Sequence, residues 1–337
     1  MIASSIWDHV TVTVIDKRDY FETITGSIKG AVDHPLLDDM LAMNDKTAAA
    51  YQKITFKQAN LLKVHKAGNF IDVQNLTTAT PERIDFDVLI ICTGFSYQGP
   101  IRGEATSLKD RKGEFEAYWK QIDDAKHIAI VGGGIVGVEL AAEYAVHFQE
   151  NKIDKKVTIY SASPLLSSLP PKAGVLAEEF FKAYDVKIMK ERFDDKVEHP
   201  DTLVIKCTGY NYPTDFMKED FSDCLASNGQ IYVNDLFQVS AKNPRVNSLA
   251  DGVCPNIFAF GDVCYTSLNE LKSVPSMAFM RDILVNNVLQ IARSQRPSNQ
   301  IPERLPELSS VSLGPRQGIM ILNGLVNLAA DGGKLKF

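Results

Sequence analysis

The stretch that decides the fold is Ile128-Ala129-Ile130-Val131-Gly132-Gly133-Gly134-Ile135-Val136-Gly137-Val138-Glu139, near the middle of 337 residues. The run at residues 127–131, directly before Gly132, predicts a strand buried on both faces of a parallel sheet, and a helix is expected after it. In such a turn the first glycine permits the tight bend, the second lets the backbone approach a pyrophosphate, and the third allows the helix to pack on the strand. Gly132, Gly134 and Gly137 therefore predict a dinucleotide site, with phosphates at the amino end of the helix.

A second strand, predicted at residues 156–160, closes a strand-helix-strand unit of about 30 residues, the size expected of a nucleotide-binding crossover. The residue at the end of this strand ordinarily selects the cofactor. An acid binds the ribose hydroxyls of NAD, whereas an arginine accepts the extra phosphate of NADP. Here the strand ends in Tyr160 and Ser161, so the choice between NADH and NADPH stays open.

A second nucleotide-binding region is indicated by an acid at the end of an early strand. Residues 10–16 form a β-branched run that ends in Asp16, a pattern typical of a ribose-binding carboxylate and equally of an ordinary strand with a turn-forming aspartate. Two later predicted strands favour a ribose-binding role for Asp16, because both are apolar and end in small or acidic residues. They cover residues 86–94, ending in Thr93-Gly94, and residues 256–262, ending in Gly261-Asp262.

The order of these motifs resembles the FAD- and NAD(P)-dependent pyridine nucleotide oxidoreductases, and in particular their apoptosis-inducing-factor-like, or ferroptosis-suppressor-like, branch. The shared order is an acid-ended strand, a Cys-Thr-Gly strand end, the central glycine turn, a second Cys-Thr-Gly at residues 207–209 and a late Ala-Phe-Gly-Asp. The resemblance covers residues 10 to 319, nearly the whole chain.

The resemblance implies an α/β fold with two Rossmann-like three-layer nucleotide-binding domains, in which the NAD(P) domain is inserted into the FAD domain. A short C-terminal α+β remnant is expected after them. The implied FAD-binding domain covers residues 1–103 and 205–295 and is incomplete at its N-terminus. The NAD(P)-binding domain covers residues 104–204, and a linker and C-terminal segment cover residues 296–337.

The resemblance also implies roles for particular residues. Asp16 would bind the adenosine ribose of FAD, and Gly261 with Asp262 would hold its ribityl and phosphate portion. Glu139 would position the nicotinamide. The remaining implied cofactor-binding residues are Thr93, Gly94 and Met277 on the FAD side and Gly132, Gly134 and Gly137 on the NAD(P)H side. No catalytic acid, base or nucleophile and no metal ligand is expected, because a flavin itself does the redox chemistry.

The sequence departs from this family at its start. A full member begins with a strand, a glycine-rich turn and a helix, whereas only nine residues precede Val10. Gly26 and Gly30 have the wrong spacing to replace that turn. We therefore expect either a truncated sequence or a chain that has lost tight flavin binding.

Two functions stay open at this point. The first is an FAD-dependent NAD(P)H oxidoreductase that passes electrons to a quinone-like acceptor. The second is a non-catalytic nucleotide- or partner-binding protein that does not retain FAD.

Charge and composition limit the partners. The net charge is −6, with both signs mixed along the chain, which argues against nucleic acid as a main partner. The sequence contains no run of 18 apolar residues, so no membrane-spanning helix is predicted. An apolar helix face at residues 276–293 favours domain packing over a peripheral membrane contact. The oligomeric state stays open.

The five cysteines are dispersed and include no Cys-x-x-Cys pair. Redox-active dithiols and structural zinc sites usually need close pairing in sequence, so neither is expected. An odd, dispersed set fits a reducing compartment. We expect a cytoplasmic location, with mitochondrial and membrane-associated locations as alternatives.

Overall fold

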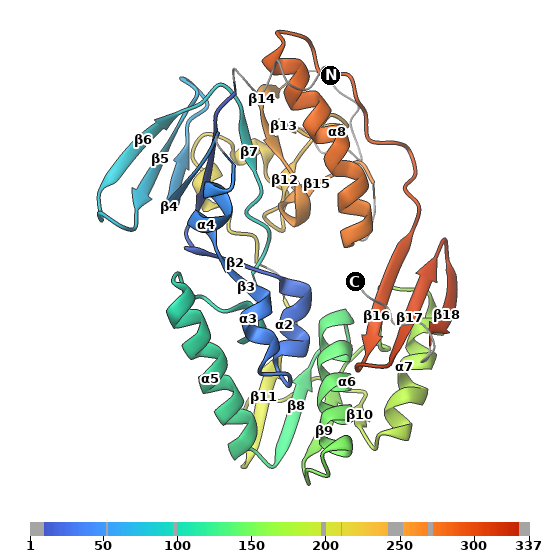
Figure 1. Ribbon diagram of the computed structural model, residues 1–337. Helices are drawn as coiled ribbons and strands as arrows, with labels where there is room; N and C mark the ends of the chain where they lie inside the picture. The colour runs from blue at the N-terminus through green and yellow to red at the C-terminus, as the bar shows by residue number, and fades with distance from the viewer. Residues whose placement is uncertain are drawn as a thin grey trace. The chain divides into compact units, whose positions relative to one another are not determined.

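The computed structural model describes residues 10–51, 53–96, 100–196, 200–209, 211–241, 252–268 and 272–329. The chain divides into two compact units, each built from segments that are far apart in sequence (Figure 1). Unit 1 comprises Met1–Asp19, Met43–Ser96 and Tyr210–Pro306, and unit 2 comprises Tyr20–Ala42, Tyr97–Gly209 and Glu307–Phe337.

Unit 2 is built on a four-stranded parallel sheet with strand order β10-β9-β8-β11. Its strands are β8 (His127–Val131), β9 (Lys156–Tyr160), β10 (Lys187–Met189) and β11 (Thr202–Lys206). Helix α6 (Ile135–Glu150) connects β8 to β9, and α7 (Pro171–Ala183) connects β9 to β10. This alternation of strand and helix confirms the predicted Rossmann-like α/β fold, and β8 and β9 have the predicted bounds.

Helix α6 is the central helix of unit 2, because other elements cover most of its surface. It contacts β8 and β9 of the sheet, α7, the short helix α2 (Ile24–Gly30) and the strand β16 (Leu308–Leu313). Its small and apolar residues are therefore almost completely buried, from Val138 to Ala142 and again at Tyr144. Strand β16 pairs with β17 (Gln317–Leu322), and β17 pairs with β18 (Leu325–Ala329), in a three-stranded antiparallel sheet.

The remaining elements of unit 2 come from the early part of the chain and from the segment before β8. The first group is β2 (Tyr20–Glu22), α3 (Leu36–Met40) and β3 (Leu41–Met43), and the second is η1 (Pro100–Arg102) and α5 (Leu108–Asp124). Strands β2 and β3 pair with each other.

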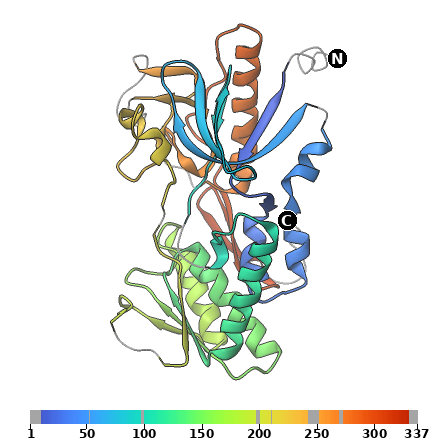
Figure 2. The same cartoon turned by 90° about the vertical axis from the view of Figure 1, so that its left-hand side faces the viewer.

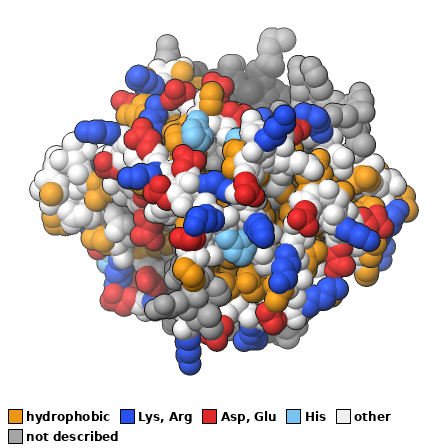
Figure 3. Space-filling view, turned by 90° about the horizontal axis from the view of Figure 1, so that it is seen from below, with side chains coloured by type: hydrophobic (Ala, Val, Ile, Leu, Met, Phe, Trp, Pro, Cys, Tyr) orange, Lys and Arg blue, Asp and Glu red, His pale blue; other side chains and the backbone are white. Residues whose placement is uncertain are grey.

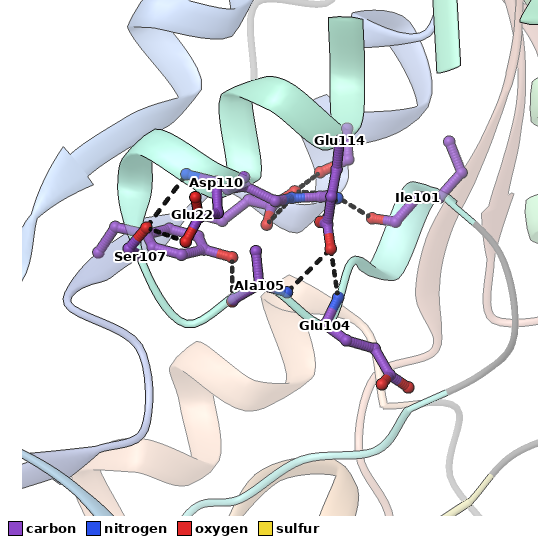
Figure 4. Close-up of polar contacts among 10 residues, drawn as sticks. Glu22, Ile101, Glu104, Ala105, Ser107, Asp110 and Glu114 are labelled. Carbon is purple, nitrogen blue, oxygen red and sulfur yellow. Dashed lines mark hydrogen bonds and ion pairs between the residues drawn. The ribbon is translucent and has the colours of Figure 1, made fainter. Parts of the chain in front are cut away.

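A buried ion pair joins these two groups (Figure 4). Arg111 of α5 donates two hydrogen bonds to the carboxylate of Glu22 in β2, at 3.0 Å from Nε and 2.8 Å from Nη2. The Arg111 side chain is fully buried and that of Glu22 is 5% exposed. Arg111 also donates to the Ile101 carbonyl and to Glu114, whose carboxylate accepts the backbone N–H of Ala105. Because buried charges need such partners, the cluster holds β2 in unit 2.

The compact units therefore group the chain differently from the domain boundaries expected from the sequence. Residues 20–42 and 307–329 were expected in the FAD-binding domain and in a separate C-terminal segment, and both pack in unit 2 with α6 and α5. The physical reasons are the Arg111–Glu22 pair and the contact of β16 with α6. Which cofactor each segment serves stays a prediction.

The described strands of unit 1 form three small sheets; Figures 1 and 2 show them from two sides. In the first, with order β1-β4-β5-β6, β1 runs parallel to β4 and the other pairs are antiparallel. In the second, with order β13-β14-β7, β14 runs parallel to β7. The third pairs β12 with β15. The strands are β1 (Val12–Asp16), β4 (Ile54–Val64), β5 (Phe70–Asn75), β6 (Pro81–Asp85), β7 (Leu89–Ile91), β12 (Ile231–Tyr232), β13 (Gln238–Ser240), β14 (Val253–Ala259) and β15 (Cys264–Tyr265).

Helices complete unit 1 around one hydrophobic core. The longest is α8 (Val274–Ala292), which contributes Met280 and Leu284 to the same core as Phe258 of β14. The shorter ones are α4 (Asn44–Ala49), η2 (Asp215–Met217), η3 (Ser222–Cys224) and η4 (Gly261–Val263). The packing of α8 on the core agrees with the domain-packing role favoured from its sequence.

Two surface properties follow from the structure. Basic and acidic side chains are interspersed over the face drawn in Figure 3. Among the described residues, every helix is too short or too polar to cross a lipid bilayer.

Candidate nucleotide-binding site

The predicted nucleotide turn lies at the carboxyl edge of the unit 2 sheet. Val131, the last residue of β8, pairs in register with Tyr160 of β9 and Lys206 of β11. The residues that follow these strands, Gly132 and Ser161 among them, therefore lie at one edge. In open parallel sheets, ligands bind outside this edge. The structure thus brings the glycine turn, the end of β9 and the second Cys-Thr-Gly motif together.

Two glycines of the turn are required by close backbone packing. Gly132 has a φ of +124°, and a methyl group on it would lie 2.8 Å from the carbonyl oxygen of Cys207. A methyl group on Gly137 would lie only 2.0 Å from the carbonyl oxygen of Gly132. Side chains are therefore excluded at both positions, and α6 packs directly against the turn, as the glycine spacing predicted.

Gly134 differs from these two because it faces open space. It is the N-cap of α6, with a φ of −76°, and no side chain caps the helix there. Apart from its chain neighbours, no described atom lies within 4 Å of the position a methyl group would take. The first backbone N–H groups of α6 and the positive end of its dipole are thus open to an anion. The residues present fit a nucleotide pyrophosphate.

The end of β9, where the cofactor's ribose is expected, carries neither an acid nor an arginine. The Ser161 hydroxyl donates to the Ser163 carbonyl at 2.7 Å, and the Ser161 N–H donates to the Met189 carbonyl at 2.9 Å. The Tyr160 ring packs edge-on against Phe193. The sequence predicted no packing role for Ser161. In the structure it lies under Gly133, where an added methyl group would meet its Oγ at 2.5 Å.

Glu139 projects from α6 toward the C-terminal sheet. Its Oε1 accepts the backbone N–H of Ser312 in β16 at 2.8 Å. Burial raises the pKa of Glu139 to about 7, although the hydrogen bond from Ser312 opposes the shift. Burial likewise raises the pKa of Glu143, one helical turn further on, to about 7. The positioning role of Glu139 toward a nicotinamide stays a prediction.

The residues expected to bind FAD in unit 1 lie mainly at one strand edge. Strands β7 and β14 are parallel and in register at Ile91 and Ala259, so the segments after them leave the same edge. These segments carry Thr93 with Gly94, and Gly261 with Asp262. Gly94 and Gly261 have φ values of +63° and +80°, and no described atom beyond their chain neighbours lies within 4 Å of a methyl group added to either. The edge therefore leaves room for a ligand.

Asp16 and Met277 lie elsewhere in unit 1. Asp16 ends β1 in the other parallel pair, is exposed, and accepts the backbone N–H of Arg18 at 2.9 Å. Met277 lies in the first turn of α8 and packs against the core. A capping box between Ser273 and Ser276 closes the start of that helix. The assignment of Asp16 and Met277 to FAD stays a prediction.

Sequence reasoning missed two side chains that hold the Gly261–Asp262 turn. The Lys272 ammonium donates to the carbonyls of Gly261 and Cys264. The Gln230 amide donates to the carbonyls of Asp262, at 2.9 Å, and Cys264, at 3.1 Å. Both bond to backbone rather than to side chains, so residue type and spacing carried no signal for them. In the part of the chain that the structure describes, no cluster of His, Cys, Asp and Glu is placed to hold a metal ion.

The sheet of unit 2 and its glycine turn define a Rossmann-like nucleotide-binding fold. The model of the pyridine nucleotide-disulphide oxidoreductases matches residues 9–280, and the chain belongs to this family.

Among curated proteins, the chain is similar to ferroptosis suppressor protein 1 of Xenopus tropicalis, with 25% identity over 94% of this chain and 83% of the relative. It is also similar to apoptosis-inducing factor homolog A of Dictyostelium discoideum, with 26% identity over 98% of this chain and 83% of the relative. These relatives confirm the resemblance to the apoptosis-inducing-factor-like branch.

Solved structures agree on the fold. NDH2 from Plasmodium falciparum in complex with NADH superposes with a TM-score of 0.65 at 14% identity, over 96% of this chain and 88% of that one. The water-forming NADH oxidase from Lactobacillus brevis, bound to NADH, gives a TM-score of 0.65 at 19% identity, over 94% of this chain and 70% of that one.

Proposed function

We propose that this protein is an FAD-dependent oxidoreductase that takes hydride from NAD(P)H and passes the electrons to a quinone-like acceptor. The observation that carries the proposal is the uncapped start of α6 at Gly134, which is open to a ligand while Gly132 and Gly137 close the turn around it. Membership of the pyridine nucleotide-disulphide oxidoreductase family supports the same conclusion.

The residues of unit 2 would hold the nicotinamide nucleotide. The N–H groups of the first turn of α6 would donate to the pyrophosphate, and the close approach at Gly134 would let them reach it. Glu139 lies on the same helix, and its carboxyl group accepts the Ser312 N–H. This carboxyl group would be able to hold a proton near neutral pH. Its part in the reaction is to position the nucleotide rather than to transfer a proton to it.

The residues of unit 1 would hold FAD. The open backbone at Gly94 and Gly261 would allow the flavin's ribityl and phosphate portion to approach, and exposed Asp16 would offer its carboxylate to ribose hydroxyls. A bound flavin supplies a ring that accepts two electrons as hydride and can release them singly. No side chain is needed as a catalytic acid, base or nucleophile for that exchange.

The quinone-like acceptor rests on the resemblance to the apoptosis-inducing-factor-like branch. It is the finer part of the proposal, and an acceptor assay separates it from the rest. The choice between NADH and NADPH is also left to experiment, because Tyr160 and Ser161 end the strand that ordinarily makes it.

The test uses the full chain purified in the presence of FAD. We expect a yellow protein that oxidises NADH or NADPH faster when a short-chain quinone is added than with oxygen alone. If FAD-loaded protein reduces oxygen or dyes but never the quinone, the acceptor is wrong. If the protein stays colourless with excess FAD, yet NADH raises its thermal stability, the non-catalytic nucleotide-binding alternative holds instead.

A further inference from the structure

A pocket with a volume of about 450 Å³ lies in unit 1, between the end of α8 and the strand β14. Pro255 and Asn256, which line it, are the third and fourth residues of β14, whereas the Gly261–Asp262 turn follows the end of that strand. The pocket is therefore displaced from the edge expected to bind FAD. Its volume is in the range of pockets that hold small organic ligands.

The apolar part of the pocket comes from separate segments of unit 1. Leu236 lies before β13, and Ile291 lies in the last turn of α8. Pro255 of β14 and Pro297, beyond α8, add two rigid rings to these walls. None of the residues that line the pocket is aromatic, so an aromatic ligand would find no ring to stack on. The lining therefore favours an alkyl chain, which gains free energy by leaving water.

A buried side chain holds two of these walls together. Asn287 of α8 is fully buried, and its amide donates to the carbonyls of Leu236, at 3.1 Å, and Asn299, at 2.8 Å. Its side-chain oxygen accepts the backbone N–H groups of Ser298 and Asn299. The segment that carries Pro297 is thus fixed both to α8 and to the wall at Leu236. Because these contacts lie within the protein, the pocket is formed before a ligand binds.

Two amide side chains in the lining already have partners within the protein. The Gln238 amide donates to the Pro255 carbonyl at 2.8 Å, and its side-chain oxygen accepts another side-chain amide. The Asn256 amide donates to the Asp87 carbonyl at 2.9 Å and to the side-chain oxygen of Asn69 at 3.1 Å. These amides fix the shape of the pocket, so the donors for a ligand have to come from other lining residues.

Two consecutive residues supply the polar groups that stay available to a ligand. Gln295 and Arg296 follow α8, line the pocket and are exposed, so the pocket opens to solvent on their side. Neither side chain makes a hydrogen bond or an ion pair with another residue that the structure describes. In contrast, the exposed Arg281 of α8 pairs with Asp282. No acidic residue lines the pocket, so the charge of Arg296 makes it complementary to an anion.

We propose that this pocket binds a small monocarboxylate with an alkyl chain, the chemistry of a medium-chain fatty acid. The Arg296 guanidinium would donate two parallel hydrogen bonds to the carboxylate, and the Gln295 amide would add a third. The alkyl chain would lie against Leu236, Ile291 and Pro297. A cationic chain of the same length would meet the same apolar walls together with a like charge. The site needs neither nucleotide nor flavin and is independent of the proposed function.

The test titrates octanoate, octanamide and octylamine separately into the full chain and follows binding by saturation-transfer NMR of the ligand. We expect octanoate to bind with a dissociation constant of about 1 mM, in keeping with its small size. Octanamide should bind more weakly, and octylamine should not bind. Added salt should weaken octanoate binding, because it screens the exposed charge of Arg296. No saturable binding of octanoate, or equal binding of octylamine, would overturn the proposal.

Substitutions locate the binding site. Arg296→Met keeps an unbranched side chain but removes the charge, and should weaken octanoate binding about fivefold, the upper range for an exposed ion pair. Arg293→Met is the matched control, since Arg293 is also exposed at the end of α8 but does not line the pocket, and its affinity should stay native. Ile291→Trp should fill the pocket and weaken octanoate and octanamide alike.

Equal octanoate affinity in Arg296→Met and Arg293→Met would refute the role of Arg296 and with it the proposal. Native affinity in a folded Ile291→Trp protein would place the alkyl chain elsewhere and would refute it as well. If Ile291→Trp fails to fold, the two arginine variants still decide, because both change exposed side chains that make no contact needed for folding.

Discussion

The two strand edges at which cofactors are expected differ in how their glycines are held. At the edge of unit 2, Gly132 and Gly137 are packed against backbone atoms, and β8 is buried. At the edge of unit 1, Gly94 and Gly261 face open space and are glycines only because of their positive φ. Strand β7 there is also less covered, with Ile90 42% exposed.

This difference separates a preformed site from an open one. The turn in unit 2 is held by the protein's own packing, so it should bind a nicotinamide nucleotide without help from a second ligand. The edge in unit 1 has room and suitable backbone, and its Gly261–Asp262 turn is held by side-chain hydrogen bonds rather than by close backbone packing. We therefore expect stability to be most sensitive to substitutions in unit 2 and flavin affinity to depend on unit 1.

The largest expected effect comes from breaking the buried ion pair of unit 2. Arg111→Met should lower the free energy of unfolding by about 3–5 kcal/mol, because it leaves the Glu22 carboxylate buried without a counter-charge. Urea unfolding followed by circular dichroism measures it. The matched control is Arg281→Met, which removes an exposed Arg281–Asp282 pair in unit 1 and should cost no more than about 1 kcal/mol. Equal losses in the two variants would contradict the contrast between the units.

The next effect tests the close packing of the nucleotide turn. Gly137→Ala should destabilise unit 2 by about 3 kcal/mol, the upper part of the range for overpacking, since the methyl group would overlap the Gly132 carbonyl. Gly113→Ala is the control in the same unit. Gly113 lies in α5 with no described atom within 4 Å of an added methyl group, so that change should stabilise by about 0.5–1 kcal/mol. The same sign in both variants, by thermal unfolding, would refute this view of the turn.

A third prediction concerns pH. The folded-state pKa of Glu139 is about 7 against an ordinary value of 4.5, so the folded protein binds a proton that the unfolded chain has released. Its contribution to stability is present below about pH 4.5 and is lost as the pH rises through 7. Glu139→Gln should remove about 3 kcal/mol of this decline, because the amide does not titrate. The amide oxygen can still accept the Ser312 N–H, so the local structure should be kept. Urea midpoints at a series of pH values measure the effect. A decline that is unchanged in the variant would show that Glu139 is not its source, and Glu143 would then be the remaining group to substitute.

The smallest effect is expected at the open edge of unit 1. Gly261→Ala should cost about 1 kcal/mol through backbone strain alone, because its φ is +80° and nothing else obstructs the methyl group. NADH affinity should not change, whereas FAD affinity should fall. Calorimetric titrations with each nucleotide check this. A loss of NADH binding would mean that the two sites are not separately formed.

Much of the nucleotide fold could be predicted, because its signals are local. The strands predicted at residues 127–131 and 156–160 are β8 and β9 with these bounds. The glycine spacing also identified which positions pack against backbone. In contrast, the strand predicted at residues 86–94 is only Leu89–Ile91, because the positive φ of Gly94 and exposure of the edge shorten it.

The features that could not be predicted join distant parts of the chain. Arg111 and Glu22 are 89 residues apart, and Glu139 and Ser312 are 173 apart. No periodic pattern relates such pairs, since they depend on how separate elements pack. For this reason the grouping of residues 20–42 with unit 2 differs from the boundary expected from the motifs.

The most direct test of the account is a calorimetric titration of NADH into the native protein and into Gly134→Ala, without added FAD. The added methyl group meets open space and Gly134 has an extended backbone, so the unfolding midpoint should not change. It should nevertheless block the approach of the pyrophosphate and weaken NADH binding at least about tenfold, or about 1.4 kcal/mol. Equal affinity of the two proteins for NADH would contradict the assignment of this turn as the nucleotide site.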